Sequence, residues 1–286
     1  MGARTGVALP GKAGPRSGYR VGFVGGGNMA NALIGGLIGA GLYQPREIVA
    51  SDIDARKRSA LRRTLKIAVT GDNVGLVRDS AVVVLAVKPQ VMDTVLAGFR
   101  QSVTAKKVFI SIAAGVSTGQ IERVLGTDAR VVRVMPNTPA LLGKAMSVVV
   151  RGSAARPADE KLALRLLRAV GRARAVRDET LIDAVTGLSG SGPAYVYRFA
   201  EALIAGGVEA GLDADMAAEL ALQTISGAAA MLQEAGDTPA RLRQAVTSPG
   251  GTTQAGLEEM ARRGFATTVV KAVQRATQRS RELGRR

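Results

Sequence analysis

The chain has 286 residues, 47% of them apolar, which is enough to bury a sizeable core and to form two domains. It contains no cysteine and no histidine, which excludes disulfides, thiolate zinc sites, a cysteine nucleophile and the most common general base. The formal net charge of +16 would suit nucleic acid, but only 3% of the residues are aromatic and the arginines are spread along the whole chain, so we expect no nucleic-acid partner and no metal site.

Residues 1–18 are rich in glycine, proline and isolated basic residues, which predicts a flexible tail. A short β-branched and aromatic segment then runs into clustered glycines, and apolar residues recur at helical spacing over 29–38, so we expect a strand, a tight turn and a helix. Gly25, Gly27 and Ala30 fit the dinucleotide-binding pattern G-x-G-x-x-G/A. In this pattern the glycines make the turn and admit a diphosphate, and the third small residue packs the helix on the strand.

The same stretch allows a second interpretation, as a signal peptide or a membrane helix. No charged residue lies between Arg20 and Arg46, and basic residues precede this gap. The apolar part, residues 29–40, is however well short of the roughly 20 residues that a bilayer requires. We therefore expect a cytoplasmic protein with no membrane association.

A second short strand is expected at 47–51, about 20 residues after the glycine pattern, where an NAD site usually carries an acid for the ribose hydroxyls. The position 20 residues after the pattern falls on Ala50 or Ser51, the last two residues of this strand. A serine at its end, followed by Arg56 and Lys57, favours the ribose phosphate of NADP. Asp52 and Asp54 leave NAD open, because either carboxylate could turn toward the ribose.

Strands and helices then alternate, which predicts a doubly wound parallel sheet with its ligand at the carboxyl ends of the strands. The further strands are expected near 66–69, 81–87, 108–113, 131–135, 145–150 and 173–176. Four segments lie at the carboxyl ends of strands in this arrangement: 25–29, 86–89, 113–115 and 136–138. Their shared position indicates a cofactor site, although any one of them could simply end a strand.

Past Asp178 no further β-rich run occurs, and helices are expected at 193–210, 213–235, 239–246, 253–263 and 266–283. Two loops rich in glycine and serine, 187–195 and 248–253, interrupt them. Each would place backbone N–H groups at a helix start, where an anion can bind, although ordinary helix capping gives the same pattern. The expected domains are therefore a tail at 1–18, a nucleotide-binding domain at 19–177 and a helical domain at 178–286.

Together these motifs resemble the pyrroline-5-carboxylate reductase family, which catalyses the last step of proline synthesis, over about residues 21–283. The resemblance is carried by the segments 25–30, 86–89, 135–139, 183–195 and 248–253. It implies an α/β fold, in which an N-terminal Rossmann doubly wound sheet is followed by an all-α dimerisation domain. It also implies reduction of 1-pyrroline-5-carboxylate to L-proline by NADP(H), with NAD(H) as the alternative cofactor, in a homo-oligomer that is a dimer or a decamer.

The resemblance further implies the residues of the site. Cofactor contacts would fall on Gly25, Gly26, Gly27, Asn28, Met29, Ser51, Asn73, Ala86, Val87, Lys88, Pro89, Ala113 and Ala114. The substrate carboxylate would rest on N–H groups and hydroxyls of Gly251, Thr252 and Thr253. A cyclic imine is itself basic near neutral pH and can arrive protonated, so positioning would supply most of the acceleration. We assign the catalytic role to the Thr253 hydroxyl, bonded to the ring nitrogen.

Two residues limit how far the family's site can be carried over to this chain, and two other functions were considered. Some relatives carry an amide at the position of Ala245, and Glu201 could face the site but is expected on an exposed helix face. A 3-hydroxyacid dehydrogenase would need a lysine base, yet lysine is absent between Lys161 and Lys271. An NADP(H) sensor without catalysis would not need the second anion loop at 248–253.

Overall fold

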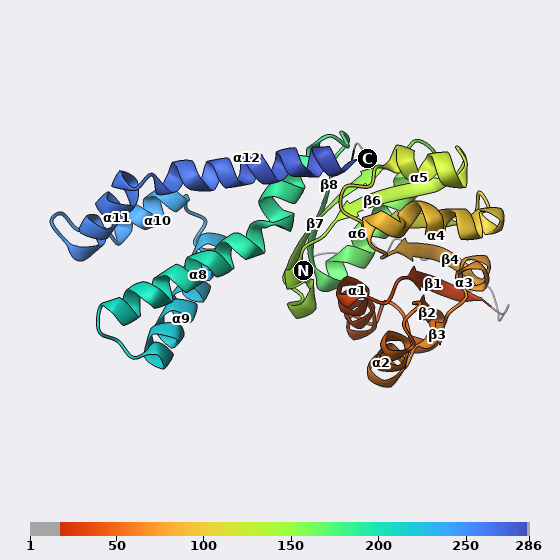
Figure 1. The fold of residues 1–286 in the computed structure, drawn as a ribbon, viewed down its shortest axis with the longest axis horizontal. Helices are drawn as coiled ribbons and strands as arrows, with labels where there is room; N and C mark the ends of the chain where they lie inside the picture. The colour runs from red at the N-terminus through yellow and green to blue at the C-terminus, as the bar shows by residue number, and fades with distance from the viewer. Residues whose placement is uncertain (1–17, 285–286) are drawn as a thin grey trace, which may run out of the picture. The chain divides into compact units, whose positions relative to one another are not determined.

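The computed structural model describes residues 18–284, so the tail predicted at 1–18 lies almost entirely outside the described residues. The chain divides into two compact units, Met1–Glu179 and Thr180–Arg286, which we call the sheet unit and the helical unit (Figure 1).

The described part of the sheet unit contains an eight-stranded sheet in the order β3-β2-β1-β4-β5-β6-β7-β8. The strands are β1 Tyr19–Val24, β2 Ile48–Ser51, β3 Ala68–Thr70, β4 Ser80–Leu85, β5 Val108–Ser111, β6 Arg130–Met135, β7 Ala145–Arg151 and β8 Gly171–Ala175. Strands β1 to β6 are parallel. The strand order reverses between β1 and β4: β2 and β3 follow on one side of β1, and β4, β5 and β6 follow on the other. A doubly wound sheet binds its ligand at this point.

The last two strands depart from the all-parallel arrangement. Strand β7 is antiparallel to β6, and β8 is parallel to β7. The connection 136–144 is too short for a parallel crossover, which takes a dozen or more residues, so the chain returns beside β6 in the opposite direction.

Helices cover both faces of the sheet (Figure 1). The buried side chains of α1, α2 and α6 join one apolar cluster, and those of α3, α4 and α5 join another. The bounds are α1 Asn28–Gly39, α2 Ala55–Leu65, α3 Asn73–Asp79, α4 Met92–Phe99, α5 Thr118–Leu125 and α6 Pro157–Leu167, with short turns η1 Pro45–Glu47, η2 Pro89–Val91, η3 Arg100–Ser102, η4 Thr138–Leu142 and η5 Arg168–Val170. This two-faced arrangement confirms the predicted Rossmann-type sheet.

The helical unit contains no strand in its described residues. Its elements are α7 Leu181–Val185, the π-helix η6 Thr186–Gly190, α8 Gly192–Glu209, α9 Ala214–Glu234, α10 Pro239–Ala245, α11 Thr252–Arg262 and α12 Phe265–Gly284. Helix α8 packs along α9, and α12 packs on α7 and η6. The Ser280 hydroxyl of α12 donates to a carboxylate oxygen of Asp183 at 2.6 Å.

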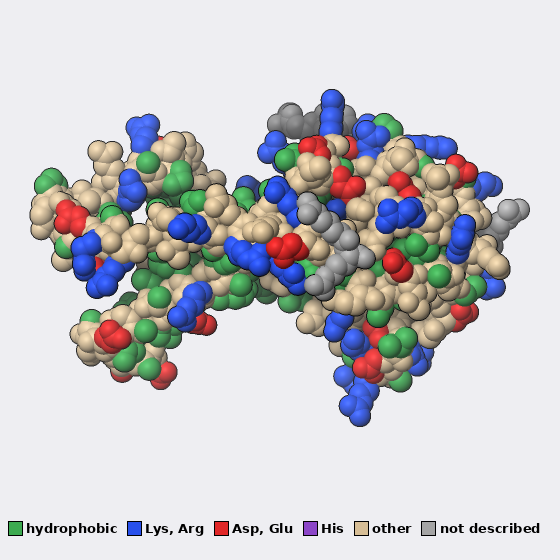
Figure 2. All heavy atoms as spheres, turned by 45° about the horizontal axis from the view of Figure 1, so that its top comes forward, with side chains coloured by type: hydrophobic (Ala, Val, Ile, Leu, Met, Phe, Trp, Pro, Cys, Tyr) green, Lys and Arg blue, Asp and Glu red, His purple; other side chains and the backbone are tan. Residues whose placement is uncertain are grey.

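The helical unit buries few of its own side chains. Apart from glycine, the buried residues within its described range are Ile182, Ala200, Ala217, Ala221 and Ser280. Large apolar side chains are instead exposed along its helices, including Leu220, Leu222, Met231, Leu232 and Val270. Figure 2 shows apolar side chains at the surface of this unit, and Lys and Arg side chains distributed over both units rather than gathered in one patch. So much exposed apolar surface is typical of a unit that packs against another chain.

One correction concerns the segment 187–195, which was expected to be a loop that either binds an anion or simply caps the next helix. It is helical, since η6 leads almost directly into α8. Gly187 is buried against α12, and the Tyr195 hydroxyl donates to the Gly187 carbonyl oxygen at 3.1 Å. The glycine is therefore a packing residue, because it lets η6 approach α12 closely.

Gly187→Ala is expected to destabilise the helical unit by about 1–3 kcal/mol, since overpacking of this kind costs that amount. An added Cβ would collide with the Thr277 hydroxyl and lie 2.7 Å from the Val273 carbonyl oxygen. Urea unfolding monitored by far-UV circular dichroism measures the change. The control is Gly206→Ala in α8, where an added Cβ meets no atom within 4 Å. Equal stability of the two variants would contradict the packing role.

Candidate active site

The turn after β1 is held between the ends of β2 and β4, the strands on either side of β1. Gly25 has φ +104°, and a Cβ there would lie 2.6 Å from the carbonyl oxygen of Ala86, so only glycine fits without strain. Its N–H donates to the Ser51 carbonyl oxygen at 2.9 Å, and the Ala86 N–H donates to the Val24 carbonyl oxygen at 2.8 Å. The turn is thus fixed against the ends of β2 and β4.

Helix α1 begins at the open side of this turn. Its N-cap is Gly27, which makes no side-chain cap, so the first N–H groups of the helix and the positive end of its dipole face outward. A Cβ added at Gly27 would meet no atom within 4 Å. Ala30 is fully buried, as close packing of helix on strand requires. This combination of bare N–H groups and free space fits the diphosphate of a dinucleotide.

The sheet brings the other predicted cofactor residues to the same edge. Strands β2, β1, β4 and β5 are neighbours, and their carboxyl ends are followed by Asp52, Gly25, Ala86 and Ile112. Lys88 and Pro89 are exposed in the segment that leads into η2. After β5, Ala113 is buried and Ala114 is exposed.

Ser51 and Asn73 lie together at the end of β2. The Ser51 side chain is buried, and its hydroxyl donates to the amide oxygen of Asn73 at 2.6 Å. Asn73 is the first residue of α3 and is partly exposed. Since the serine proton is used within the protein, the amide nitrogen of Asn73 is the donor of this pair that remains available to a ligand.

Asp52, which the sequence left as one of two candidate acids, has a fixed position. Its carboxylate accepts from the Gly26 N–H and from the Asp54 N–H, both at 2.9 Å. Its side chain is only 10% exposed. Asp54 instead caps α2 by accepting from the Arg56 N–H at 2.8 Å.

In the helical unit, the segment 248–253 forms a second bare helix start. Gly250 has φ +69°, and the Gly251 N–H donates to the Ser248 carbonyl oxygen at 3.0 Å. Gly251 caps α11 without a side chain, so the first N–H groups of that helix stand beside the exposed Thr252 and Thr253. A small carboxylate matches this arrangement of N–H and hydroxyl donors.

The two residues that limit the carry-over of the family's site, Ala245 and Glu201, are both exposed. Ala245 is the last residue of α10. Glu201 lies on α8 and pairs with Arg198 at 2.8 Å, with most of both side chains exposed. The expectation of an exposed glutamate is confirmed.

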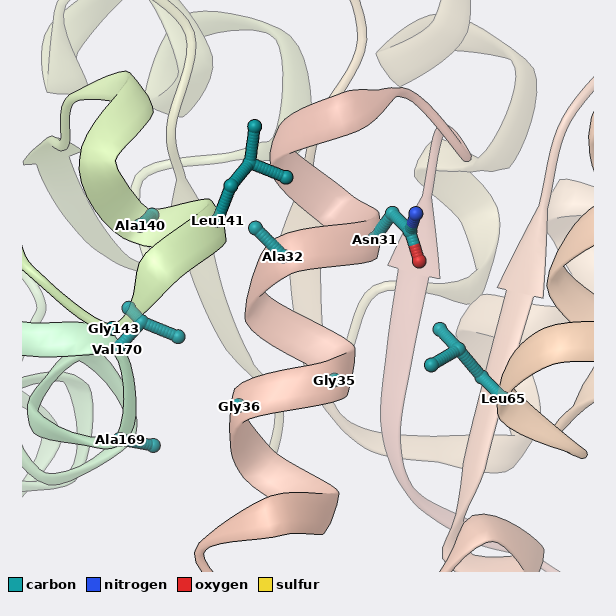
Figure 3. A pocket seen from close by; sticks show the side chains of 10 residues that line it. All are labelled: Asn31, Ala32, Gly35, Gly36, Leu65, Ala140, Leu141, Gly143, Ala169 and Val170. Carbon is teal, nitrogen blue, oxygen red and sulfur yellow. The ribbon is translucent and has the colours of Figure 1, made fainter. Parts of the chain in front are cut away.

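A pocket of about 380 Å³ lies elsewhere in the sheet unit, against α1, η4 and η5 (Figure 3). The bare helix face at Gly35 and Gly36 forms part of its wall. None of the predicted cofactor or substrate residues lines it, so it does not bear on the dinucleotide site.

The described residues hold neither a candidate membrane-spanning helix nor a candidate metal-binding cluster. No helix there is both long and apolar enough to span a bilayer. No cluster of three or more Asp or Glu residues that could hold a metal ion occurs in the same range.

Comparison with known proteins shows which protein families the two units resemble. A family model described as NADP oxidoreductase coenzyme F420-dependent matches residues 20–115, and one described as pyrroline-5-carboxylate reductase dimerisation matches residues 179–283. The helical unit is therefore a dimerisation domain. Curated relatives include the pyrroline-5-carboxylate reductases of Methanosarcina acetivorans, 44% identical over 93% of this chain and 98% of the relative, and of Arabidopsis thaliana, 40% identical over 94% and 97%.

Solved structures agree with this result. A pyrroline-5-carboxylate reductase from Coxiella burnetii has a TM-score of 0.86 and 36% identity, covering 93% of this chain and 98% of that one. The pyrroline carboxylate reductase of Plasmodium falciparum, solved with NADP bound, has a TM-score of 0.84 and 30% identity, covering 94% and 100%.

A doubly wound sheet with a bare glycine turn, followed by a dimerisation domain, defines a nicotinamide-dependent oxidoreductase. With relatives at 40–44% identity over nearly its whole length, the chain belongs to the pyrroline-5-carboxylate reductase family. The resemblance recognised in the sequence is confirmed.

Proposed function

We propose that the chain reduces the C=N bond of 1-pyrroline-5-carboxylate with NADPH, or with NADH in its place, and releases L-proline. The observation that carries the proposal is the second bare helix start at α11, which offers a carboxylate site in the same chain as the dinucleotide turn. An NADP(H) sensor has no use for that second site.

The sheet unit binds and orients the cofactor in this proposal. The first N–H groups of α1 hold the diphosphate, and the amide nitrogen of Asn73 donates to the adenosine side. The segments 86–89 and 113–114, which follow neighbouring strands, border the rest of the nucleotide. When bound, the nicotinamide supplies the hydride.

The helical unit binds the substrate in this proposal. A carboxylate at the start of α11 gains up to about 1 kcal/mol from the helix dipole, and more where water is excluded. The Thr253 hydroxyl oxygen accepts from the protonated ring nitrogen and fixes the direction of the ring. No general acid is required, because the cyclic imine arrives protonated, which agrees with a chain that has no histidine.

One assay tests the activity. Purified protein, NADPH and 1-pyrroline-5-carboxylate are mixed, NADPH oxidation is followed by absorbance, and proline is quantified by mass spectrometry. We expect proline to form in equal amount to the NADPH consumed. Cofactor binding without proline formation would favour the sensor instead.

Thr253→Ala is expected to lower kcat about tenfold, since an orienting hydrogen bond contributes about 1–1.5 kcal/mol. The Kd for NADPH should not change, because Thr253 belongs to the helical unit's carboxylate site. The control is Thr268→Ala. Thr268 is an exposed residue of the next helix, α12, and its hydroxyl donates to the carbonyl oxygen of Gly264, just before that helix. If Thr253→Ala turns over as fast as the control, the positioning role is wrong.

We further propose that the chain is a cytoplasmic homodimer that can assemble into a decamer. The dimerisation model and the exposed apolar helices of the helical unit support self-association. Light scattering coupled to size-exclusion chromatography distinguishes the dimer from the decamer.

A further inference from the structure

The turn between β2 and α2 places a fixed carboxylate beside the dinucleotide turn. Both carboxylate oxygens of Asp52 accept backbone N–H groups, one from Gly26 and one from Asp54, each at 2.9 Å. The Gly26 bond ties the carboxylate to the second residue of the glycine turn. Because the side chain is only 10% exposed, the charge cannot swing freely away from that turn.

Lys57 and Arg58, the basic residues that contact Asp52, are not hydrogen-bonded to the glycine turn themselves. Lys57 lies 3.8 Å from the Asp52 carboxylate, and its side chain is 51% exposed. The Arg58 guanidinium donates to the carbonyl oxygens of Asp52 and Ile53, at 2.7 and 3.1 Å, and so holds the turn. Ile53 is 96% exposed and carries no charge. The charge bonded directly to the glycine turn is therefore a carboxylate, with the half-exposed Lys57 ammonium beside it and the exposed Arg56 in the first turn of α2.

NADH and NADPH differ in the group that such a carboxylate meets. NADH carries a 2′-hydroxyl on the adenosine ribose, which can donate to a carboxylate, whereas NADPH carries a phosphate, which a carboxylate repels. In a doubly wound sheet the adenosine ribose lies at the end of the second strand, which here is β2.

We propose that Asp52 is the residue that sets the choice between NADH and NADPH in this chain. Its fixed carboxylate accepts from the ribose hydroxyl of NADH and disfavours the phosphate of NADPH, and Lys57 is the counter-ion that keeps NADPH usable. The inference rests on the proposed function only in requiring that a nicotinamide dinucleotide binds at the glycine turn.

Asp52→Asn tests the proposal because the amide oxygen can still accept from the Gly26 N–H while the charge is removed. We expect the ratio of Kd for NADPH to Kd for NADH, measured by calorimetry, to fall by about tenfold or more. Adenosine 2′,5′-bisphosphate and ADP, which carry the two adenosine ends without a nicotinamide, should show the same change. The ratio of kcat/KM values should follow it.

The matched control is Asp54→Asn, which removes one charge from the same turn and keeps an oxygen to cap α2. Its Kd ratio should stay within about twofold of the wild type. A second variant, Lys57→Met, is expected to change the ratio in the opposite direction by weakening NADPH binding more than NADH binding. This variant does not depend on how Asp52→Asn folds, because Lys57 is half exposed.

An unchanged Kd ratio in Asp52→Asn, or an equal change in Asp54→Asn, would overturn the assignment of Asp52 and leave the reductase proposal standing. Failure of the wild type to bind either dinucleotide would overturn both. Binding of both dinucleotides without proline formation would overturn the reductase alone, since the Kd ratios would still be measurable.

Discussion

Gly27→Ala is expected to raise the Kd for NADPH by about 100-fold or more, equivalent to about 2.7 kcal/mol, while the fold remains intact. The backbone at Gly27 has φ −73° and ψ −179°, which any residue can adopt. An added Cβ meets no atom of the protein within 4 Å. The methyl group therefore costs the free protein little and fills the space through which the diphosphate approaches.

The measurement is a calorimetric titration with NADPH beside a thermal unfolding curve. We expect the Tm of Gly27→Ala to match that of the wild type. The control is Gly39→Ala, at the other end of the same helix, where an added Cβ also meets no atom within 4 Å. Wild-type affinity in Gly27→Ala would show that the diphosphate lies elsewhere and would remove the basis for the cofactor site.

The cofactor turn could be predicted because its signals are local. A β-branched strand, a glycine with a left-handed φ and a helix with an apolar stripe follow one another within twenty residues or so. Ligands bind at the carboxyl ends of parallel strands. This rule predicted that Ala86 and Ala113 lie at the same edge of the sheet as the glycine turn, although they are distant from it in sequence.

The features that could not be predicted depend on contacts between distant residues. Glycine and serine at 187–195 indicated a loop, but the segment is helical and Gly187 packs closely on α12, some ninety residues later. The bond between Gly26 and Asp52 spans 26 residues, and no pattern in the sequence indicates which of two nearby carboxylates makes it. The antiparallel β7 follows from the short connection 136–144, and alternation of strands and helices in the sequence does not indicate a strand's direction.

Glu179→Ala is expected to lower the free energy of unfolding by up to about 3–5 kcal/mol, because it leaves the buried Arg133 guanidinium without its carboxylate partner. Glu179 is the last residue of the sheet unit. Its carboxylate accepts from the Thr118 N–H at 2.8 Å, from the Thr118 hydroxyl at 2.6 Å and from the Arg133 guanidinium at 2.8 Å. The Arg133 side chain, on β6, is only 6% exposed, whereas the Glu179 side chain is 27% exposed.

Urea unfolding followed by circular dichroism measures this loss. The control is Glu160→Ala, which removes an equally exposed glutamate but leaves Arg151, 38% exposed and 3.2 Å away, in contact with water. This change should cost no more than about 1 kcal/mol. Because Thr118 begins α5, just after the predicted cofactor segment 113–114, Glu179→Ala should also weaken NADPH binding. Equal losses in the two variants would contradict a special contribution from the buried pair.

A double variant separates the buried charge from the lost hydrogen bonds. In Arg133→Met with Glu179→Ala the unpaired guanidinium is absent, so we expect part of the stability to return relative to Glu179→Ala alone. Recovery should be incomplete, because the Thr118 N–H and hydroxyl have still lost their acceptor. If the double variant is no more stable than Glu179→Ala, the cost arises at Thr118, and the carboxylate serves chiefly to fix the start of α5 rather than to neutralise Arg133.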